Sequence, residues 1–150
     1  NNKEIRYYHD ILGFNYRMTN IQAAIGLAQT EQLKKILQKK KEVFSYYFET
    51  LNKYVEFQRP INEAIEPSYW IVCVLFNSES QKQKIIRAFD QNGIEFRPLF
   101  TPVDKFPFYE NNDNLKVSNN IYNRGICLPS FPELSKNELN KICNTIINNL

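Results

Sequence analysis

One long amphipathic helix dominates the first third of this 150-residue chain. Thr19, followed three residues later by Gln22, forms a capping box, in which two side chains satisfy the free amides at a helix start. Apolar side chains then recur at helical spacing with charged residues between them, at Leu33, Ile36, Leu37, Phe44, Tyr47, Phe48 and Leu51. Such a stripe packs one face of a helix against a core. The pattern predicts a helix from residue 19 to about residue 54.

The first half of this helix has a different pattern. Its apolar residues cover a broad arc and many of them are small: Ile21, Ala23, Ala24, Ile25, Leu27 and Ala28. Small residues on several sides allow neighbouring elements to approach closely. Two interpretations stay open, namely that this half is wedged between domains or subunits, or that it is buried in the domain's own core.

The remaining residues predict strands that alternate with helices and loops. The expected strands are 55–58, 69–76, 94–97 and 125–128, and the clearest, 69–76, is aromatic and β-branched enough to be buried on both faces. Ser78 or Ser80 starts a helix that stops at Gly93, a further helix covers 115–123, and Ser135 starts the closing helix. A long loop covers 98–113. The order predicts an α/β fold of the α+β type, with helices packed on a small, mostly antiparallel sheet in a single domain, 1–150.

Composition limits the classes of function. Hydrophobic residues at 43% and charged residues at 23% are typical of a soluble globular protein. The longest apolar run, 70–76, is far too short to span a membrane, and no signal peptide is visible, so we expect a cytoplasmic protein without a membrane partner.

The lysines between Lys34 and Lys41 fall between apolar helical positions, and the net charge is only +3. This pattern favours a solvated helix face over a nucleic-acid site. The competing hypothesis is an unrelated basic helical interaction module, which would bind nucleic acid in a salt-dependent way.

Cysteine and histidine offer little catalytic chemistry. Cys73, Cys127 and Cys143 are odd in number and lie in apolar surroundings, which predicts reduced core residues and neither a disulfide framework nor a metal site. The single histidine, His9, is interpreted as a loop residue that makes hydrogen bonds, not as a general base. We therefore expect no metal.

The loop before the long helix is a candidate binding site. Gly13 permits a positive φ and hence a sharp turn, and the capping box holds Asn15 and Arg17 just before the helix. An amide and a guanidinium on a fixed loop suit an anion, above all a phosphate. The alternative is that both side chains only tie the loop to its own backbone.

A second candidate is the loop from Arg97 to Tyr109. Prolines at 98, 102 and 107 restrict it, and aromatic residues with Arg97, Asp104 and Lys105 could form the wall of a small-molecule pocket. The alternative is a loop that buries its aromatic side chains against the closing helices.

Three segments carry a resemblance to a known family. They are His9 to Ala24; Phe96-Arg97-Pro98-Leu99-Phe100 with Pro102 and Tyr109; and Gly125-Ile126-Cys127-Leu128-Pro129-Ser130 with Pro132. Together they resemble the DegT/DnrJ/EryC1/StrS family of pyridoxal-phosphate-dependent aminotransferases, which act on nucleotide-linked keto-sugars. The resemblance implies the small C-terminal domain of a fold-type I transferase, with its preceding interface loop and helix.

The resemblance also implies what this chain lacks. In the family, the Schiff-base lysine, the carboxylate that pairs with the pyridine nitrogen and the stacking aromatic belong to an N-terminal large domain. None has a counterpart among these residues, and the lysine's setting would lie upstream of Asn1. We therefore expect no catalytic residue in this chain, and no transaminase activity from it alone.

The site residues follow from the same resemblance. Asn15 would bind the phosphate of pyridoxal 5'-phosphate held by the other subunit of a homodimer. Arg17, Tyr16 and Arg97 would contribute to the substrate site. Asp104 stands where many relatives have a histidine, so the usual contact with an anion is in doubt there, although the position remains a substrate-site candidate.

The implied reaction moves an amino group, from glutamate, to a nucleotide-linked keto-deoxysugar for a cell-surface polysaccharide or glycan. The alternative is a non-catalytic regulatory or sensor relative of the same fold. A lysine in the family setting upstream would favour the enzyme, and its absence would favour the regulator.

Overall fold

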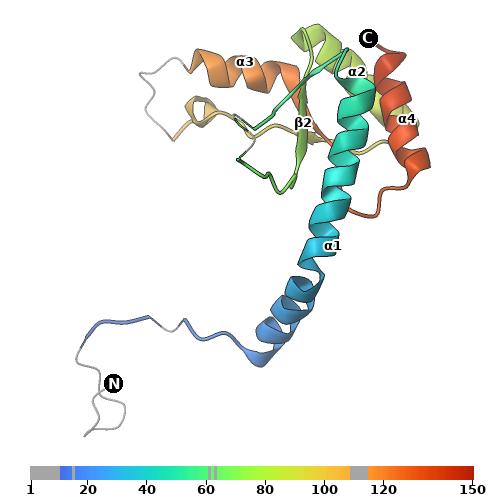
Figure 1. Cartoon of the computed structure of the whole chain (residues 1–150). Coiled ribbons are helices and arrows are strands. Elements are labelled where there is room, and N and C mark those ends of the chain that lie inside the picture. Colours follow the sequence, from blue (N-terminus) through green and yellow to red (C-terminus); the bar gives the residue numbers. More distant parts are fainter. Residues whose placement is uncertain (1–10, 15, 61, 63, 109–114) are drawn as a thin grey trace, which may run out of the picture. The chain divides into compact units, whose positions relative to one another are not determined.

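The structure is a computed structural model that describes residues 11–14, 16–60, 62, 64–108 and 115–150. Contacts divide the chain into two compact units, Asn1–Leu33 and Lys34–Leu150. Helix α1 (Asn20–Leu51) begins in the first unit and ends in the second. The second unit holds the sheet and the other helices, which are shown in Figure 1.

The capping box at the start of α1 is confirmed. The backbone amide of Thr19 donates to Gln22 Oε1 at 2.9 Å, and the amide of Gln22 donates to Thr19 Oγ1 at 3.3 Å. The helix runs almost as far as its pattern predicts. Its buried positions begin only at Lys40 and continue with Val43, Tyr47 and Leu51.

The sheet has four short strands in the order β1-β2-β4-β3, and every neighbouring pair is antiparallel. The strands are β1 (Glu56–Phe57), β2 (Val72–Leu75), β3 (Arg97–Pro98) and β4 (Gly125–Leu128). Strand β4 matches its predicted range. The predicted α+β fold with a small antiparallel sheet is therefore confirmed.

One face of the sheet carries the core. Val72, Val74, Ile126 and Leu128 alternate along β2 and β4 and are at most 3% exposed. They join one apolar cluster with α1, α2 (Glu79–Asn92) and α4 (Lys136–Ile147), so three helices cover this face. In Figure 1 these helices lie close to β2.

The prediction that residues 69–76 form a strand buried on both faces is wrong. Strand β2 begins only at Val72, and its burial alternates between buried and half-buried positions. Tyr69 lies in the left-handed region at φ 49°, which an extended strand cannot include, and Trp70 is exposed.

The caps of the other helices follow the local sequence. Ser78, not Ser80, caps α2 and accepts from the amide of Gln81, and Gly93 ends the helix at φ 61°. Ser135 starts α4 in a full capping box with Glu138. Because the Ile94 amide still donates to the Phe89 carbonyl, the chain leaves α2 late, and β3 begins at Arg97 instead of Ile94.

On the second face of the sheet, neighbouring elements pack closely against Gly125. A Cβ atom there would lie 2.3 Å from Leu99 Cδ1, 2.7 Å from Leu75 Cδ2 and 3.0 Å from the carbonyl oxygen of Ile121. Ile121 belongs to α3 (Lys116–Arg124). Only a glycine lets β4, the chain after β3 and α3 come together at this point.

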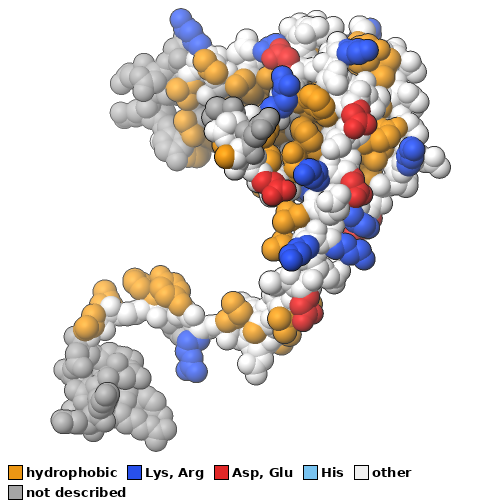
Figure 2. All heavy atoms as spheres, in the orientation of Figure 1, with side chains coloured by type: hydrophobic (Ala, Val, Ile, Leu, Met, Phe, Trp, Pro, Cys, Tyr) orange, Lys and Arg blue, Asp and Glu red, His pale blue; other side chains and the backbone are white. Residues whose placement is uncertain are grey.

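The described part of the first unit has apolar side chains on its surface. Ile11, Leu12, Phe14, Tyr16 and Met18 precede α1, and Ile21, Ile25 and Leu27 follow in its first turns; all are exposed. Figure 2 shows the hydrophobic side chains of this stretch. The buried residues of the core cluster begin only at Val43, so none of them comes from this half. Gly13 does not use the positive φ that a glycine permits.

A membrane-spanning helix is not found within the described ranges.

Candidate functional site

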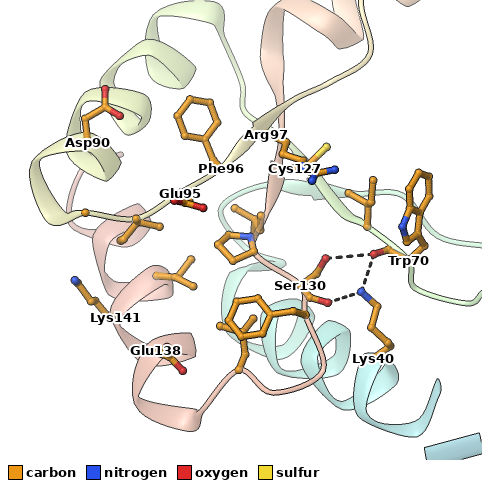
Figure 3. A pocket seen from close by; sticks show the side chains of 18 residues that line it. Lys40, Trp70, Asp90, Glu95, Phe96, Arg97, Cys127, Ser130, Glu138 and Lys141 are labelled. Atoms are coloured by element: carbon orange, nitrogen blue, oxygen red, sulfur yellow. Dashed lines mark hydrogen bonds between the residues drawn. The ribbon is translucent and has the colours of Figure 1, made fainter. Parts of the chain in front are cut away.

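A broad pocket of about 1090 Å³ opens in the second unit. Its walls are β3 with the end of α2 on one side and β4 with α4 on the other, and Lys40 of α1 closes one end. Figure 3 shows charged side chains of both signs around it, among them Lys40, Arg97, Glu95 and Glu138. The pocket is thus mixed in charge and large enough for a small molecule.

Lys40 is the most unusual charged residue of this pocket. It is 9% exposed, and its Nζ donates to the carbonyl oxygen of Trp70 at 2.7 Å and to the carbonyl oxygen of Ser130. Burial lowers the pKa of this amine below its ordinary value. The sequence interpretation placed Lys40 on a solvated face, which is wrong. Lys34 and Lys35, in the same run, are exposed as predicted.

The chain after β4 is held by two residues of α1. Lys40 binds the carbonyl of Ser130, and the hydroxyl of Tyr47 donates to the carbonyl of Pro129 at 2.9 Å. Tyr47 is fully buried, and burial raises its pKa above the ordinary value. The Leu128-Pro129-Ser130 run therefore has a structural explanation, since its backbone carbonyls anchor it to the helix.

Arg97, a predicted substrate-site residue, lies at the pocket wall. It is exposed, it lies in β3, and it pairs in register with Cys127 of β4. Within the described part of the chain, its guanidinium makes no hydrogen bond or ion pair. A guanidinium in this situation can bind a carboxylate or phosphate from outside the chain.

Asp104 lies in the short 3-10 helix η1 (Val103–Lys105) and does not line the pocket. Its Oδ2 accepts a hydrogen bond of 2.6 Å from the Nδ2 of Asn119 in α3. Its Oδ1 is buried and has no hydrogen-bond partner among the described residues. Asp104 thus joins the loop to α3.

The aromatic side chains of the second loop remain on the surface. Phe100 is 82% exposed and Phe108 is 72% exposed, and the rings of Phe106 and Phe108 stack at 5.4 Å. The alternative in which this loop buries its aromatics against the closing helices is wrong. Tyr109 lies outside the described residues.

The first loop is described only in part. Asn15 and His9 lie outside the described residues, so the structure does not test their predicted roles. Tyr16 is 89% exposed, its ring lies 5.7 Å from that of Phe14, and Arg17 is also exposed.

The cysteines make a contact that was not predicted from the sequence. All three are free, and Cys127 and Cys143 are buried as predicted. Cys73, however, is half-buried, and its sulfur lies 3.6 Å from that of Cys127 on the adjacent strand. Only the sheet register brings these residues together, because they are 54 positions apart.

The burial of Lys40 could have been predicted from the helical pattern of the sequence. Residues 40, 43, 47 and 51 follow one helical stripe, so position 40 falls on the buried face although it lies in a basic run.

Comparisons with known proteins agree with this fold. Residues 1–147 match the DegT/DnrJ/EryC1/StrS aminotransferase family. GDP-perosamine synthase of Escherichia coli O157:H7 is 37% identical over 142 residues, which are 94% of this chain and 39% of that protein. GDP-perosamine synthase of Vibrio cholerae is 35% identical over 149 residues, which are 95% of this chain and 40% of that protein.

Among solved structures, the fold resembles the Helicobacter pylori aminotransferase PseC, involved in the biosynthesis of pseudoaminic acid. The TM-score is 0.81 at 22% identity, over 93% of this chain and 39% of that one. This chain thus spans about two fifths of the length of the relatives it matches. With a family match over almost every residue and the corresponding fold, the chain belongs to the DegT/DnrJ/EryC1/StrS aminotransferase family.

Proposed function

We propose that this chain is the C-terminal part of a pyridoxal-phosphate-dependent aminotransferase that transfers an amino group to a nucleotide-linked keto-deoxysugar. The observation that carries the proposal is the match to two GDP-perosamine synthases over nearly the whole chain and only about two fifths of their length. Their names favour a GDP-linked substrate. Glutamate is the proposed amino donor, and a cell-surface polysaccharide or glycan is the proposed destination of the sugar.

In this proposal the pyridoxal phosphate site is not formed by the described residues alone. The buried lysines are already engaged: Lys40 donates to two carbonyls, and Lys82 donates to the carbonyl of Tyr122 at 2.7 Å. Neither amine forms an ion pair with a carboxylate among these residues. The cofactor would therefore be held mainly by the preceding part of the protein.

Residues before α1 are proposed to complete that site in a homodimer. Asn15 would bind the cofactor phosphate of the partner subunit, and Arg17 and Tyr16 would lie at the substrate. The support is the surface chemistry of their neighbours, since apolar residues such as Leu12 and Phe14 are exposed and need cover from another part of the protein.

Arg97 is proposed to bind an anionic group of the substrate. Its support is the exposed guanidinium, which the described residues leave without a carboxylate partner, at the wall of a pocket. Asp104 is proposed to shape the substrate loop through its bond to Asn119. The proposed location of the protein is the cytoplasm.

The test uses the full-length protein with the upstream residues restored. Purified protein is given pyridoxal 5'-phosphate, glutamate and a GDP-, UDP- or dTDP-linked keto-deoxysugar, and the aminated sugar is measured by mass spectrometry. We expect product with the GDP-linked sugar, and a cofactor absorbance that borohydride removes. The chain 1–150 alone should give neither signal.

Arg97→Ala should raise the KM for the nucleotide sugar by roughly tenfold or more, as expected for loss of a charge-assisted contact. Arg87→Ala is the matched control, because Arg87 belongs to α2 and lies outside the pocket. A full-length protein with no lysine in the family setting and no amino transfer would overturn the proposal and favour a regulatory relative.

A further inference from the structure

Two cysteines face each other across the centre of the sheet. Cys73 of β2 and Cys127 of β4 are partners in the antiparallel register, and their sulfur atoms lie 3.6 Å apart. Register partners have side chains on the same face of a sheet. The two thiols are therefore adjacent because of the fold and not because of a chance approach of flexible loops.

The pair also occupies the kind of ladder position where strands come closest. The amide of Phe76 donates to the carbonyl of Arg124 at 3.0 Å, which marks those residues as a hydrogen-bonded pair. Hydrogen-bonded and non-hydrogen-bonded pairs alternate along an antiparallel ladder. Cys73 lies three residues before Phe76 and Cys127 lies three residues after Arg124, so the two cysteines form a non-hydrogen-bonded pair. The Cα atoms of such a pair are about 4.5 Å apart. Disulfides span Cα separations of about 4.4–6.8 Å.

The surroundings of the pair favour a reactive thiol. Cys73 is half-buried and so can be reached from solvent, whereas Cys127 is buried. The hydrogen bond between the two thiols lowers the pKa of Cys73 to about 7, and the same bond, together with burial, raises the pKa of Cys127. Arg97, the register partner of Cys127 on its other side, is a cation that offsets part of this rise in the pKa of Cys127.

We propose that Cys73 and Cys127 are a reversible oxidation site, which closes to a cross-strand disulfide on reaction with a low-molecular-weight disulfide such as oxidised glutathione. The Cys73 thiolate attacks one sulfur of the oxidant, whose S–S bond breaks and releases one glutathione thiolate. Cys127 loses its proton and attacks the Cys73 sulfur of the mixed disulfide. This step forms the Cys73–Cys127 bond and releases the second glutathione thiolate.

The electrons balance, because two protein thiols are oxidised by two electrons and one glutathione disulfide is reduced to two thiols. The two protons lost by the cysteines go to the two glutathione products. Closure brings the sulfur atoms from 3.6 Å to about 2.05 Å, a small movement for directly opposed side chains.

Cys143 provides an internal comparison. It lies in α4, is buried in the core cluster, and burial raises its pKa to about 11. A buried thiol of raised pKa reacts slowly with disulfides. The oxidation should therefore select the pair on the sheet and spare Cys143.

The test treats the folded full-length protein with oxidised glutathione, blocks free thiols with an alkylating agent under denaturing conditions, and maps the peptides by mass spectrometry. We expect one peptide pair joined through Cys73 and Cys127, two hydrogens lighter than the reduced pair, with Cys143 alkylated. Dithiothreitol should restore both free thiols. Cys127→Ala should instead retain glutathione on Cys73.

Three results would overturn the proposal. They are a stable glutathione adduct on Cys73 in the unaltered protein, alkylation of both residues after prolonged oxidation, or oxidation of Cys143 at the same rate as the pair. The mapping needs no variant, so a cysteine substitution that fails to fold leaves the result intact. The outcome is also independent of transaminase activity.

Discussion

The ammonium nitrogen of Lys40 lies 2.7 Å from the carbonyl oxygen of Trp70, thirty residues further along the chain. The same nitrogen donates to the carbonyl of Ser130, ninety residues away. One side chain of α1 therefore joins the segment before β2 to the segment after β4. Among the described residues no carboxylate pairs with this buried charge, so two backbone dipoles satisfy it.

Replacing Lys40 by methionine should destabilise the protein. Lys40→Met keeps most of the aliphatic volume but removes the ammonium donor to the carbonyls of Trp70 and Ser130, and the Trp70 carbonyl then keeps only the long bond from Ser130 Oγ at 3.4 Å. We therefore expect a loss of about 1–3 kcal/mol in the free energy of unfolding. Urea denaturation gives this value. Lys34→Met, at an exposed lysine of the same helix, should stay within about 0.5 kcal/mol of the unaltered protein. Equal effects of the two substitutions would refute the structural role of Lys40.

Two glycine substitutions should have opposite effects on the free energy of unfolding. Gly125→Ala places a Cβ 2.3 Å from Leu99 and 3.0 Å from the backbone of Ile121, so we expect a loss of about 1–3 kcal/mol. Gly26 lies inside α1, and an added Cβ atom there would have open space within 4 Å, so Gly26→Ala should stabilise the helix by roughly 0.5–1 kcal/mol. Thermal unfolding followed by circular dichroism measures both. A stable Gly125→Ala variant would contradict the close packing at β4.

Alkylation of Cys73 should begin at an unusually low pH. The thiolate is the reactive form, and the hydrogen bond shared with Cys127 lowers the pKa of Cys73 to about 7. The rate with iodoacetamide should therefore rise through pH 7 and level off before about pH 8.5, the pKa of a free cysteine. Cys127→Ala removes this hydrogen-bond partner and should move the profile to higher pH, toward that free value. Cys143→Ala should leave the profile in place, and a shift there would point to a general change in the fold.

Part of the stability contributed by the capping box of α4 should be lost in acid. The hydroxyl and the backbone amide of Ser135 both donate to Glu138 and lower the pKa of its carboxyl below 4.5. A carboxylate favoured in the folded state stabilises the protein above its unfolded pKa, and this contribution is lost as the pH falls through the lower folded value. Ser135→Ala should therefore differ from the unaltered protein more at neutral pH than in strong acid, in urea denaturation. Ser118→Ala, an exposed position within α3, should show no such pH dependence.

Local signals in the sequence were enough to place most helices and one strand. Ser78 with Gly93, and Ser135 with Glu138, act through bonds that span a few residues, so their effect can be recognised in a short window. Strand β4 was also placed correctly, between α3 and a proline. The family resemblance, carried by short motifs, is confirmed by the match over residues 1–147.

Features that depend on register or on distant partners were not predictable. The contact of Cys73 with Cys127 requires the pairing of β2 with β4, which a single sequence does not specify. The late start of β2 depends on the positive φ of Tyr69, whose ring packs 4.4 Å from Phe44. The roles of Asn15, Tyr16, Arg17, Arg97 and Asp104 remain predictions, because they concern molecules outside this chain.

The attachment of the chain after β4 has a consequence for insertions and deletions in α1. Lys40 and Tyr47 are seven residues apart, an interval that brings two helical side chains to within about 20° of the same direction. Both therefore reach the consecutive carbonyls of Ser130 and Pro129. One added or missing residue between them would turn one side chain away by about 100°. This part of α1 can accept new side chains on its outer surface, but its length is fixed.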